Sequence, residues 1–427
     1  MSDSKNDLAW TKIFEDLPII QSIEREGFFN ITSEQINCYR EARLMTKFDV
    51  QRQLPKPFVE NNLAILPITR GSYIIGKFNI FEELKDNSKL VSYGADKLPE
   101  HIKAIDIENI SSETTALLCA NVCGIFNSFF EEEEITHVIG GRMGSGSFNF
   151  QVSNTKISVS KSQIEIDGGF ESEHFIYLIE VKNLIHEDFL IRQIYYPYRT
   201  WTKKLEDKGI NKSVRNIFLT YSDGTFYLRE YKFEKIEDPN SIKLVKEEKY
   251  SIVKDSLSLE KLQEITNNIK IIEDPDLSFP QSDDLDKVIN LCELLFQRED
   301  GMSKKDISEE FGFVVRQAGY YGASARYLDL VSYENQKYSL NKNGERIFGL
   351  PLVQRQFELV SLILSHEPFN IVMKDHLQQS ERPAIDRMKH LIKDCKLYGV
   401  GKDKTTFGRR CSTIISWIDW IFDRVAI

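Results

Sequence analysis

Two neighbouring segments in the middle of the chain carry the clearest hydrophobic pattern. Residues 163–167 alternate between polar and apolar positions, which predicts a strand with one buried face. Residues 175–181 are nearly all apolar and β-favouring, which predicts a strand buried on both faces. The polar, glycine-containing residues after Asp167 predict a turn. We therefore expect two adjacent strands, the first of which ends at Asp167.

The second predicted strand ends in charged residues. Side chains alternate across a strand, so Glu180 and Lys182 share one face and Val181 points to the other. An exposed ion pair at a strand end would explain Glu180 and Lys182 alone. Asp167 can reach the same face and adds a second carboxylate. Two carboxylates can hold Mg²⁺, which acidifies a bound water and neutralises charge on a phosphate, so the arrangement suits phosphodiester hydrolysis.

Further features of the same region lead to a family resemblance. Apolar residues between 189 and 198 have helical spacing, so Arg192, Gln193 and Arg199 could face a cleft or DNA. Asp167, the Glu-Val-Lys run at 180–182 and a following helix with Gln193 resemble the PD-(D/E)XK nuclease superfamily. Residues 140–199 are similar to its type II restriction endonucleases. Ile166 stands where such families often have proline.

The resemblance implies an α/β (α+β) core in which a mixed sheet is flanked by helices. It implies that Asp167, Glu180 and Val181 bind Mg²⁺ and that Lys182 is the catalytic lysine. Gln193 would orient the attacking water or the lysine. A helix ahead of the first core strand often carries a glutamate in this superfamily, and Glu113 is the candidate.

Each of two acidic residues near this core, and the glycine-rich run beside it, has two interpretations. Glu113 also suits the first turn of a helix over residues 113–130, where the helix dipole favours a carboxylate. Glu165 shares a strand face with Asp167 and could be a third acidic ligand or a solvent-facing neighbour. The glycine-rich run at 140–147 allows a close approach of backbone to DNA or a tight turn. Arg142 and Ser147 are its candidate DNA contacts.

The N-terminal segment, residues 8–81, predicts amphipathic helices followed by a hairpin around Arg70 and Gly71. Residues 40–49 are dense in charge. They could contact a DNA backbone or form a salt-bridged loop, and the sequence does not separate these two interpretations.

The C-terminal third predicts a compact helical region. A helix over 285–296, a short helix from Ser303, a helix over 314–328 and a two-stranded wing over 331–340 resemble the winged helix-turn-helix family. The family places its second helix in the DNA major groove, although some members bind proteins. A second winged-helix-like unit is expected within 350–427. The expected DNA contacts are Lys304, Arg316, Gln317, Tyr320, Tyr321, Ser324, Arg326, Arg409 and Arg410.

Composition narrows the class of protein. The 427 residues are 41% hydrophobic and 28% charged, which predicts a soluble protein of several domains. No apolar run approaches the length of a membrane span, no secretory leader is apparent, and the six cysteines are scattered, so we expect a cytoplasmic protein. The net charge of −10 argues against a simple polyanion binder, but residues 301–427 carry 19 basic and 15 acidic residues.

The sequence therefore predicts a type II restriction endonuclease that cuts double-stranded DNA with Mg²⁺. Its expected regions are an N-terminal α/β region (1–100), a nuclease core (101–272), a winged helix-turn-helix (285–349) and a second DNA-binding unit (350–427), with a linker at 273–284. A homodimer and a cognate DNA methyltransferase are the expected partners. The alternatives are a structure-specific repair or defence nuclease of the same superfamily, and a non-catalytic winged-helix DNA-binding protein with a degenerate nuclease fold.

Overall fold

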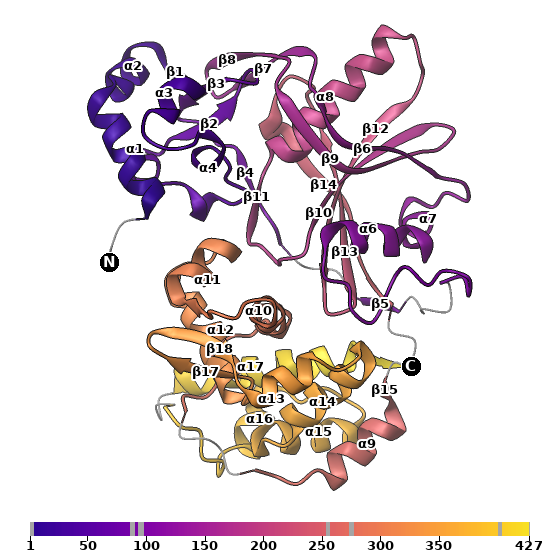
Figure 1. The fold of residues 1–427 in the computed structure, drawn as a ribbon. Helices are drawn as coiled ribbons and strands as arrows, with labels where there is room; N and C mark the ends of the chain where they lie inside the picture. Colours follow the sequence, from indigo (N-terminus) through magenta and orange to yellow (C-terminus); the bar gives the residue numbers. More distant parts are fainter. Residues whose placement is uncertain are drawn as a thin grey trace. The chain divides into compact units, whose positions relative to one another are not determined.

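The computed structural model describes residues 4–85, 90–92, 98–252, 257–272, 277–399 and 404–426. It is a mixed α and β protein whose chain divides into two compact units (Figure 1). Unit 1 contains Met1–Ser88, Ser112–Thr220 and Tyr227–Glu248, and unit 2 contains Lys89–Ser111, Tyr221–Phe226 and Lys249–Ile427. None of the helices in the described ranges is both long enough and apolar enough to cross a lipid bilayer.

The N-terminal part of unit 1 is built on a small antiparallel sheet with strand order β1-β3-β2. Its core gathers Trp10, Phe58 and neighbouring apolar residues, and the Trp10 indole donates to the carbonyl of Met45 at 2.9 Å. In chain order the elements are α1 (Lys5–Asp16), α2 (Ile19–Glu26), β1 (Phe28–Thr32), α3 (Ser33–Asn37), α4 (Ala42–Met45), η1 (Gln51–Gln53), α5 (Lys56–Asn61), β2 (Ala64–Pro67) and β3 (Ser72–Gly76). The hairpin predicted around Arg70 and Gly71 is confirmed by the pairing of β2 with β3.

A mixed sheet has seven strands within the described residues, in the order β5-β14-β13-β12-β10-β9-β6. Strands β6, β9 and β10 lie wholly in unit 1, whereas β5 belongs to unit 2. Strands β10 and β12 are parallel, whereas β9 is antiparallel to both of its neighbours. The strands are β5 (Leu90–Ser92), β6 (Thr136–Gly144), β9 (Gln163–Glu171), β10 (Phe175–Lys182), β12 (Ser213–Ser222), β13 (Thr225–Phe233) and β14 (Ile242–Ser251).

Smaller elements surround this sheet. Helices α6 and α8 pack against β9 and β10 (Figure 1), while β7 pairs with β8 and β4 pairs with β11. Their bounds are β4 (Phe81–Glu83), α6 (Glu113–Val122), α7 (Ile125–Phe130), β7 (Ser147–Val152), β8 (Thr155–Ser160), β11 (Asp188–Leu190), α8 (Arg192–Asp207) and η3 (Pro239–Ser241).

The predicted strand β10 is confirmed, but the predicted end of β9 is wrong. Strand β9 continues through Gly168 and Gly169 to Glu171. A Cβ atom on Gly168 would lie 2.6 Å from Leu117 Cδ2, and one on Gly169 would lie 2.6 Å from Ile139 Cβ. These glycines therefore allow α6 and β6 to pack closely on β9, and they do not form a turn.

The predicted start of the next helix is also wrong. Phe189 and Leu190 belong to β11, which pairs with β4, and α8 begins only at Arg192. Both apolar side chains are buried, but in the packing of a strand. Their spacing in the sequence, which suggested a helical face, therefore has another cause. Arg199 is buried as well and donates to the Tyr195 hydroxyl and the Ile236 carbonyl, so it does not reach a cleft.

Unit 2 is mainly helical. Over residues 285–340 it has the predicted order of helices followed by a hairpin, and β16 joins that hairpin in a sheet of order β16-β18-β17. The elements are β15 (Leu257–Ser258), α9 (Leu259–Asn268), α10 (Leu285–Phe296), β16 (Met302–Ser303), α11 (Lys304–Phe311), α12 (Val315–Tyr327), β17 (Val331–Glu334), β18 (Lys337–Leu340), α13 (Lys342–Phe348), α14 (Leu352–Leu364), α15 (Glu367–Gln379), α16 (Ile385–Leu391), α17 (Lys404–Phe422) and β19 (Val425–Ala426).

The C-terminal stretch does not repeat this plan. Its described residues, 350–399 and 404–426, form helices and β19, which pairs with β15, and they contain no hairpin of their own. Residues 273–276 of the predicted linker lie outside the described residues.

Candidate functional site

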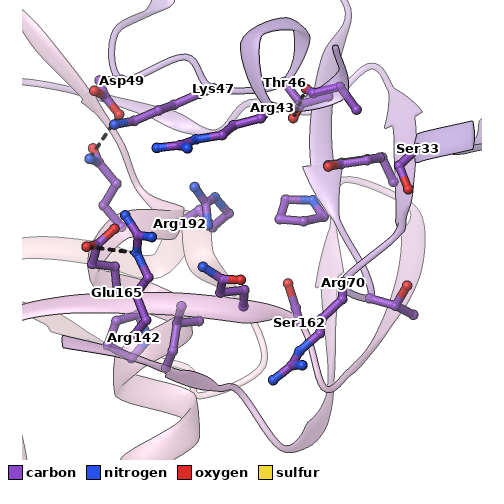
Figure 2. A pocket seen from close by; sticks show the side chains of 18 of the residues that line it. Ser33, Arg43, Thr46, Lys47, Asp49, Arg70, Arg142, Ser162, Glu165 and Arg192 are labelled. Carbon is purple, nitrogen blue, oxygen red and sulfur yellow. Dashed lines mark hydrogen bonds and ion pairs between the residues drawn. The ribbon is translucent and has the colours of Figure 1, made fainter. Parts of the chain in front are cut away.

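A cleft of about 790 Å³ in unit 1 contains most of the residues predicted near the nuclease-like motif. It is lined by side chains from the N-terminal segment and from β6, β9, β10 and α8. Figure 2 shows Arg43 and Lys47 on the N-terminal side, opposite Arg142 and Glu165.

Asp167 lies where the pairing of β9 with β10 stops. The register runs from Ile176 opposite Glu171 to Ile179 opposite Gly168. Beyond that point the Asp167 carboxylate accepts a hydrogen bond from the backbone N–H of Val181 at 2.8 Å. Burial raises the pKa of Asp167, although the hydrogen bond from Val181 and the charge of Lys182 oppose this effect.

Glu180 and Lys182 form a close pair on one face of β10. Lys182 Nζ lies 2.6 Å from Glu180 Oε1, and both side chains are only 11% exposed. Burial raises the pKa of Glu180 to about 7, even though the ammonium of Lys182 favours the carboxylate. Burial by itself would lower the pKa of Lys182, but the surrounding carboxylates outweigh it and raise that pKa above its ordinary value. Lys182 is therefore an ammonium group at neutral pH.

Glu113 reaches the same site from the start of α6. Its Oε1 lies 4.0 Å from Lys182 Nζ, and burial raises the pKa of its carboxyl group. The residue is also in the first turn of α6, as the dipole interpretation requires. Glu113 thus fits both interpretations, as a site carboxylate and as a first-turn residue favoured by the helix dipole. The reason is that the first turn of α6 borders the cleft that contains Lys182.

Gln193 is held between two carboxylates. Its Nε2 donates to Glu180 Oε1 at 2.7 Å and to Asp49 Oδ1 at 3.3 Å. A carboxylate can only accept a hydrogen bond. The NH₂ group of the Gln193 amide must therefore face the two carboxylates, and its oxygen must face away from them. The Oε1 atom is buried and has no hydrogen-bond partner among the described residues. A buried acceptor is thus left for a group that the protein does not supply.

Asp49 is a site residue that the sequence did not single out. It lies in the charged stretch 40–49, but no periodicity connects that stretch to β10, which is about 130 residues later. The backbone carbonyl of Asp49 accepts from the N–H of Leu190 at 2.9 Å, which places Asp49 beside the start of α8. The only signal in the sequence was a carboxylate within a run of basic residues.

The remaining predicted residues of this region have other partners. Arg142 lines the cleft but is ion-paired with Glu165 at 3.2 Å, and both side chains are exposed. Ser147 is exposed on β7, where its hydroxyl meets that of Ser160, and it is not among the cleft residues. Glu165 therefore shares the cleft with Asp167 but is engaged by an arginine.

Two carboxylates and one backbone carbonyl are the donors that this site offers to a divalent cation. The described residues contain no group of three or more His, Cys, Asp or Glu side chains that could hold a metal ion. Asp167 and Glu180 are nevertheless two desolvated carboxylates with raised pKa values, a situation that a cation relieves. The N–H and C=O of one strand residue point to the same edge, so the Val181 carbonyl also faces the side of Asp167. Two carboxylates and a carbonyl fit Mg²⁺, which keeps several waters.

In unit 2 burial removes part of the predicted DNA surface. Ser324 and Tyr321 point into the core, and Arg410 is buried and donates to the Pro280 carbonyl at 2.7 Å. Gln317 accepts from the backbone N–H of Val314 at the start of α12. The sequence pattern failed here because α12 has a buried face on which small and polar residues pack.

The other predicted residues of unit 2 are at or near the surface. Arg316 is exposed and donates to the Tyr320 hydroxyl. Lys304 and Arg326 lie 5.4 and 5.9 Å from the ring of Tyr333 on the hairpin. Arg409 on α17 is exposed.

Comparisons with known families leave the activity open. Three family models match separate parts of the chain, and each is described as a domain of unknown function. DUF6996 matches residues 7–75, DUF6997 matches 76–251 and DUF7226 matches 287–426. No curated protein and no solved structure matches the chain.

Proposed function

We propose that the protein is a Mg²⁺-dependent endonuclease that hydrolyses double-stranded DNA at specific sequences, as type II restriction endonucleases do. The observation that carries this proposal is the meeting of Asp167, Glu180 and Lys182 at one edge of β9 and β10, inside a cleft whose lining also includes Arg43, Lys47, Arg70 and Arg192. Ionisable groups with strongly shifted pKa values that gather in a cleft mark a candidate functional site.

The residues of this chain have distinct roles in the proposal. Asp167, Glu180 and the Val181 carbonyl would hold the ion, which supplies Lewis acidity and an acidified water when bound. Lys182 carries its proton at neutral pH, so it neutralises and orients a phosphate or water and does not act as the base. Gln193 presents a buried acceptor, its Oε1, that can orient a water molecule.

DNA selection is assigned to unit 2. The order α10, β16, α11, α12, β17 and β18 matches the order expected of a winged helix-turn-helix, in which α12 would enter the major groove. Arg316, at the exposed start of α12, is the best placed side chain for base contacts, and Lys304 and Arg326 suit phosphate contacts. A two-fold homodimer would cut both strands of a palindrome. A cognate DNA methyltransferase would protect the host sites.

The proposal is tested by incubating the purified protein with methylated and unmethylated plasmid DNA and Mg²⁺. Lys182→Ala and Glu180→Gln should each lower cleavage by at least about a hundredfold, and EDTA should abolish it. Lys203→Ala is the matched control, because Lys203 is an exposed lysine on α8 that pairs with Asp207. It should cut like the unmodified protein.

The products separate the proposed function from its alternatives. Discrete fragments support a site-specific enzyme, whereas cutting only at branched or damaged DNA supports a repair or defence nuclease. Tight sequence-specific binding without cutting supports the non-catalytic DNA-binding protein. Cutting that persists in Lys182→Ala contradicts the assignment of the site.

A further inference from the structure

The N-terminal segment contributes three cations to the cleft, and no family match or motif assigns them a role. We propose that Arg43, Lys47 and Arg70, here called the basic wall, bind the phosphodiester backbone of the DNA that reaches Asp167 and Glu180. The identity of the ligand rests on the proposed nuclease function. The N-terminal segment would thus be half of the DNA-binding cleft.

The basic wall is open to a ligand. All three side chains are exposed and line the cleft. None of them forms an ion pair with a carboxylate among the described residues. Figure 2 shows Arg43 and Lys47 close together and Arg70 beside Ser162. Two other arginines of this unit are paired: Arg25 pairs with Glu26 at 2.5 Å, and Arg142, on the facing strand, pairs with Glu165. Of the two interpretations of residues 40–49, the structure favours phosphate contact over a salt-bridged loop.

The backbone beneath the basic wall is fixed by its own core. Ala42 and Met45 bury the inner side of α4, and the Ala42 N–H donates to Asn37 Oδ1 at 2.7 Å. The turn that carries Arg70 is held by Ser33, whose N–H and hydroxyl donate to the Gly71 carbonyl at 2.8 and 3.2 Å. A prearranged set of cations loses little backbone entropy when it binds an anion.

The basic wall is also tied to the strand that leads into the catalytic residues. The Leu190 N–H donates to the Asp49 carbonyl at 2.9 Å, and the Gln51 N–H donates to Asp188 Oδ1 at 2.8 Å. Strand β11 continues directly into α8 and Gln193. The basic wall and the carboxylate site are therefore parts of one framework, so a single polyanion can contact both.

Electrostatics require such a surface near these carboxylates. Asp49, Glu113, Asp167 and Glu180 surround one ammonium group, that of Lys182, in a chain whose net charge is −10. A phosphate backbone would be repelled from this group of charges unless neighbouring cations offset them. Arg43, Lys47 and Arg70, together with Arg192 on α8, supply that offset.

The test measures binding separately from cutting. Fluorescence anisotropy of a labelled 30-base-pair duplex is followed in EDTA over a range of salt concentrations. The test protein is the triple variant Arg43→Ala, Lys47→Ala, Arg70→Ala. The control is Lys5→Ala, Lys12→Ala, Arg25→Ala, which removes the same charge from exposed positions of the same segment that do not line the cleft. Thermal melting checks that both variants fold.

The basic-wall variant should bind at least about tenfold more weakly, and its plot of log affinity against log salt should be shallower by about 2 to 3 than that of the unmodified protein. The control variant should lose much less affinity, and its salt dependence should stay close to that of the unmodified protein. Equal behaviour of the two triple variants overturns the inference, as does a preference for single-stranded RNA that depends on the basic wall. If binding needs the basic wall but no DNA is cut, the inference stands and the nuclease function fails. If DNA is cut but binding ignores the basic wall, the function stands and the inference fails.

Discussion

Gln193 donates a hydrogen bond to Asp49 across 3.3 Å, which connects a helix of the central fold to the N-terminal segment 144 residues earlier. The same Nε2 donates to Glu180 at 2.7 Å, so the amide is clamped between two carboxylates. Asp49 therefore acts on the site through Gln193 and is a positioning residue in the proposed mechanism.

Removing this carboxylate should change cleavage in two separable ways. Asp49→Ala loses the clamp and should lower the cleavage rate by about 10- to 100-fold, as removal of outer-shell partners does. Asp49→Asn keeps an acceptor but loses the charge. The pKa of Glu180 is raised mainly by burial, then by the charge of Asp167 and to a smaller extent by that of Asp49, so the acidic limb of the pH–rate profile should move to lower pH in Asp49→Asn.

The control for this pair is Asp16→Asn, which removes a carboxylate that accepts from the Tyr39 hydroxyl elsewhere in the segment. Its profile should match that of the unmodified protein. A purely structural role for Asp49 is indicated if both of its variants lose activity equally at every pH.

Protonation of Glu180 should make the stability of the metal-free protein fall as the pH rises. Its pKa is about 7 in the folded protein against an ordinary value of 4.5, so between these values the folded state retains a proton that the unfolded state has released. The free energy of unfolding should drop by up to about 3 kcal/mol from this group between pH 4.5 and pH 7. Urea unfolding in EDTA at several pH values measures it.

The comparison protein is Glu180→Gln, which cannot titrate at this position and should show a flatter dependence on pH. Mg²⁺ should stabilise the unmodified protein more at pH 8 than at pH 6, because the ion competes with the proton for Glu180. Identical pH dependence in the two proteins would show that Glu180 is ionised throughout the range.

The glycines after Asp167 should be sensitive to added volume. In Gly169→Ala the new methyl group would lie 2.6 Å from Ile139 Cβ, an atom close to the backbone that cannot move aside freely. We expect a loss of about 1–3 kcal/mol in the free energy of unfolding. Gly144→Ala on the neighbouring strand β6, where a Cβ has no atom within 4 Å, should be nearly neutral. Equal effects at both positions would contradict close packing as the cause.

A buried ion cluster in unit 2 provides a test that is independent of the cleft. Arg355 Nε lies 2.9 Å from Asp223 Oδ1, and its Nη2 lies 3.6 Å from Glu293 Oε1. Arg355→Ala would leave two buried carboxylates without their cation and should cost about 3–5 kcal/mol. Arg346→Ala breaks an exposed pair with Glu358 and should cost at most about 1 kcal/mol. Urea unfolding of both variants gives the comparison.

The sequence alone determined the features that depend on local periodicity. The run from Phe175 to Lys182 forms the expected strand, and the alternation along it places Glu180 and Lys182 on one face. The order of helices and hairpin over residues 285–340 was also predictable, because caps, glycines and apolar spacing act over a few residues. The extended conformation of Gly168 and Gly169 was not, because glycine marks a turn and a close packing contact equally well.

Only the tertiary structure decided which distant residues meet. Asp49 meets Gln193 because the segment after α4 is hydrogen-bonded to β11. Arg43 and Arg70, which come from separate elements, border the same cleft. Burial likewise removed Ser324 and Arg410 from the predicted DNA surface. Long-range packing and desolvation set these outcomes, and neither leaves a periodic signal in the chain. The identities of Asp167, Glu180 and Lys182 are written in the sequence, whereas their shifted pKa values exist only in the folded chain. Burial raises the pKa of Asp167 and of Glu180, and the carboxylates gathered around Lys182 raise the pKa of its ammonium group against the effect of burial.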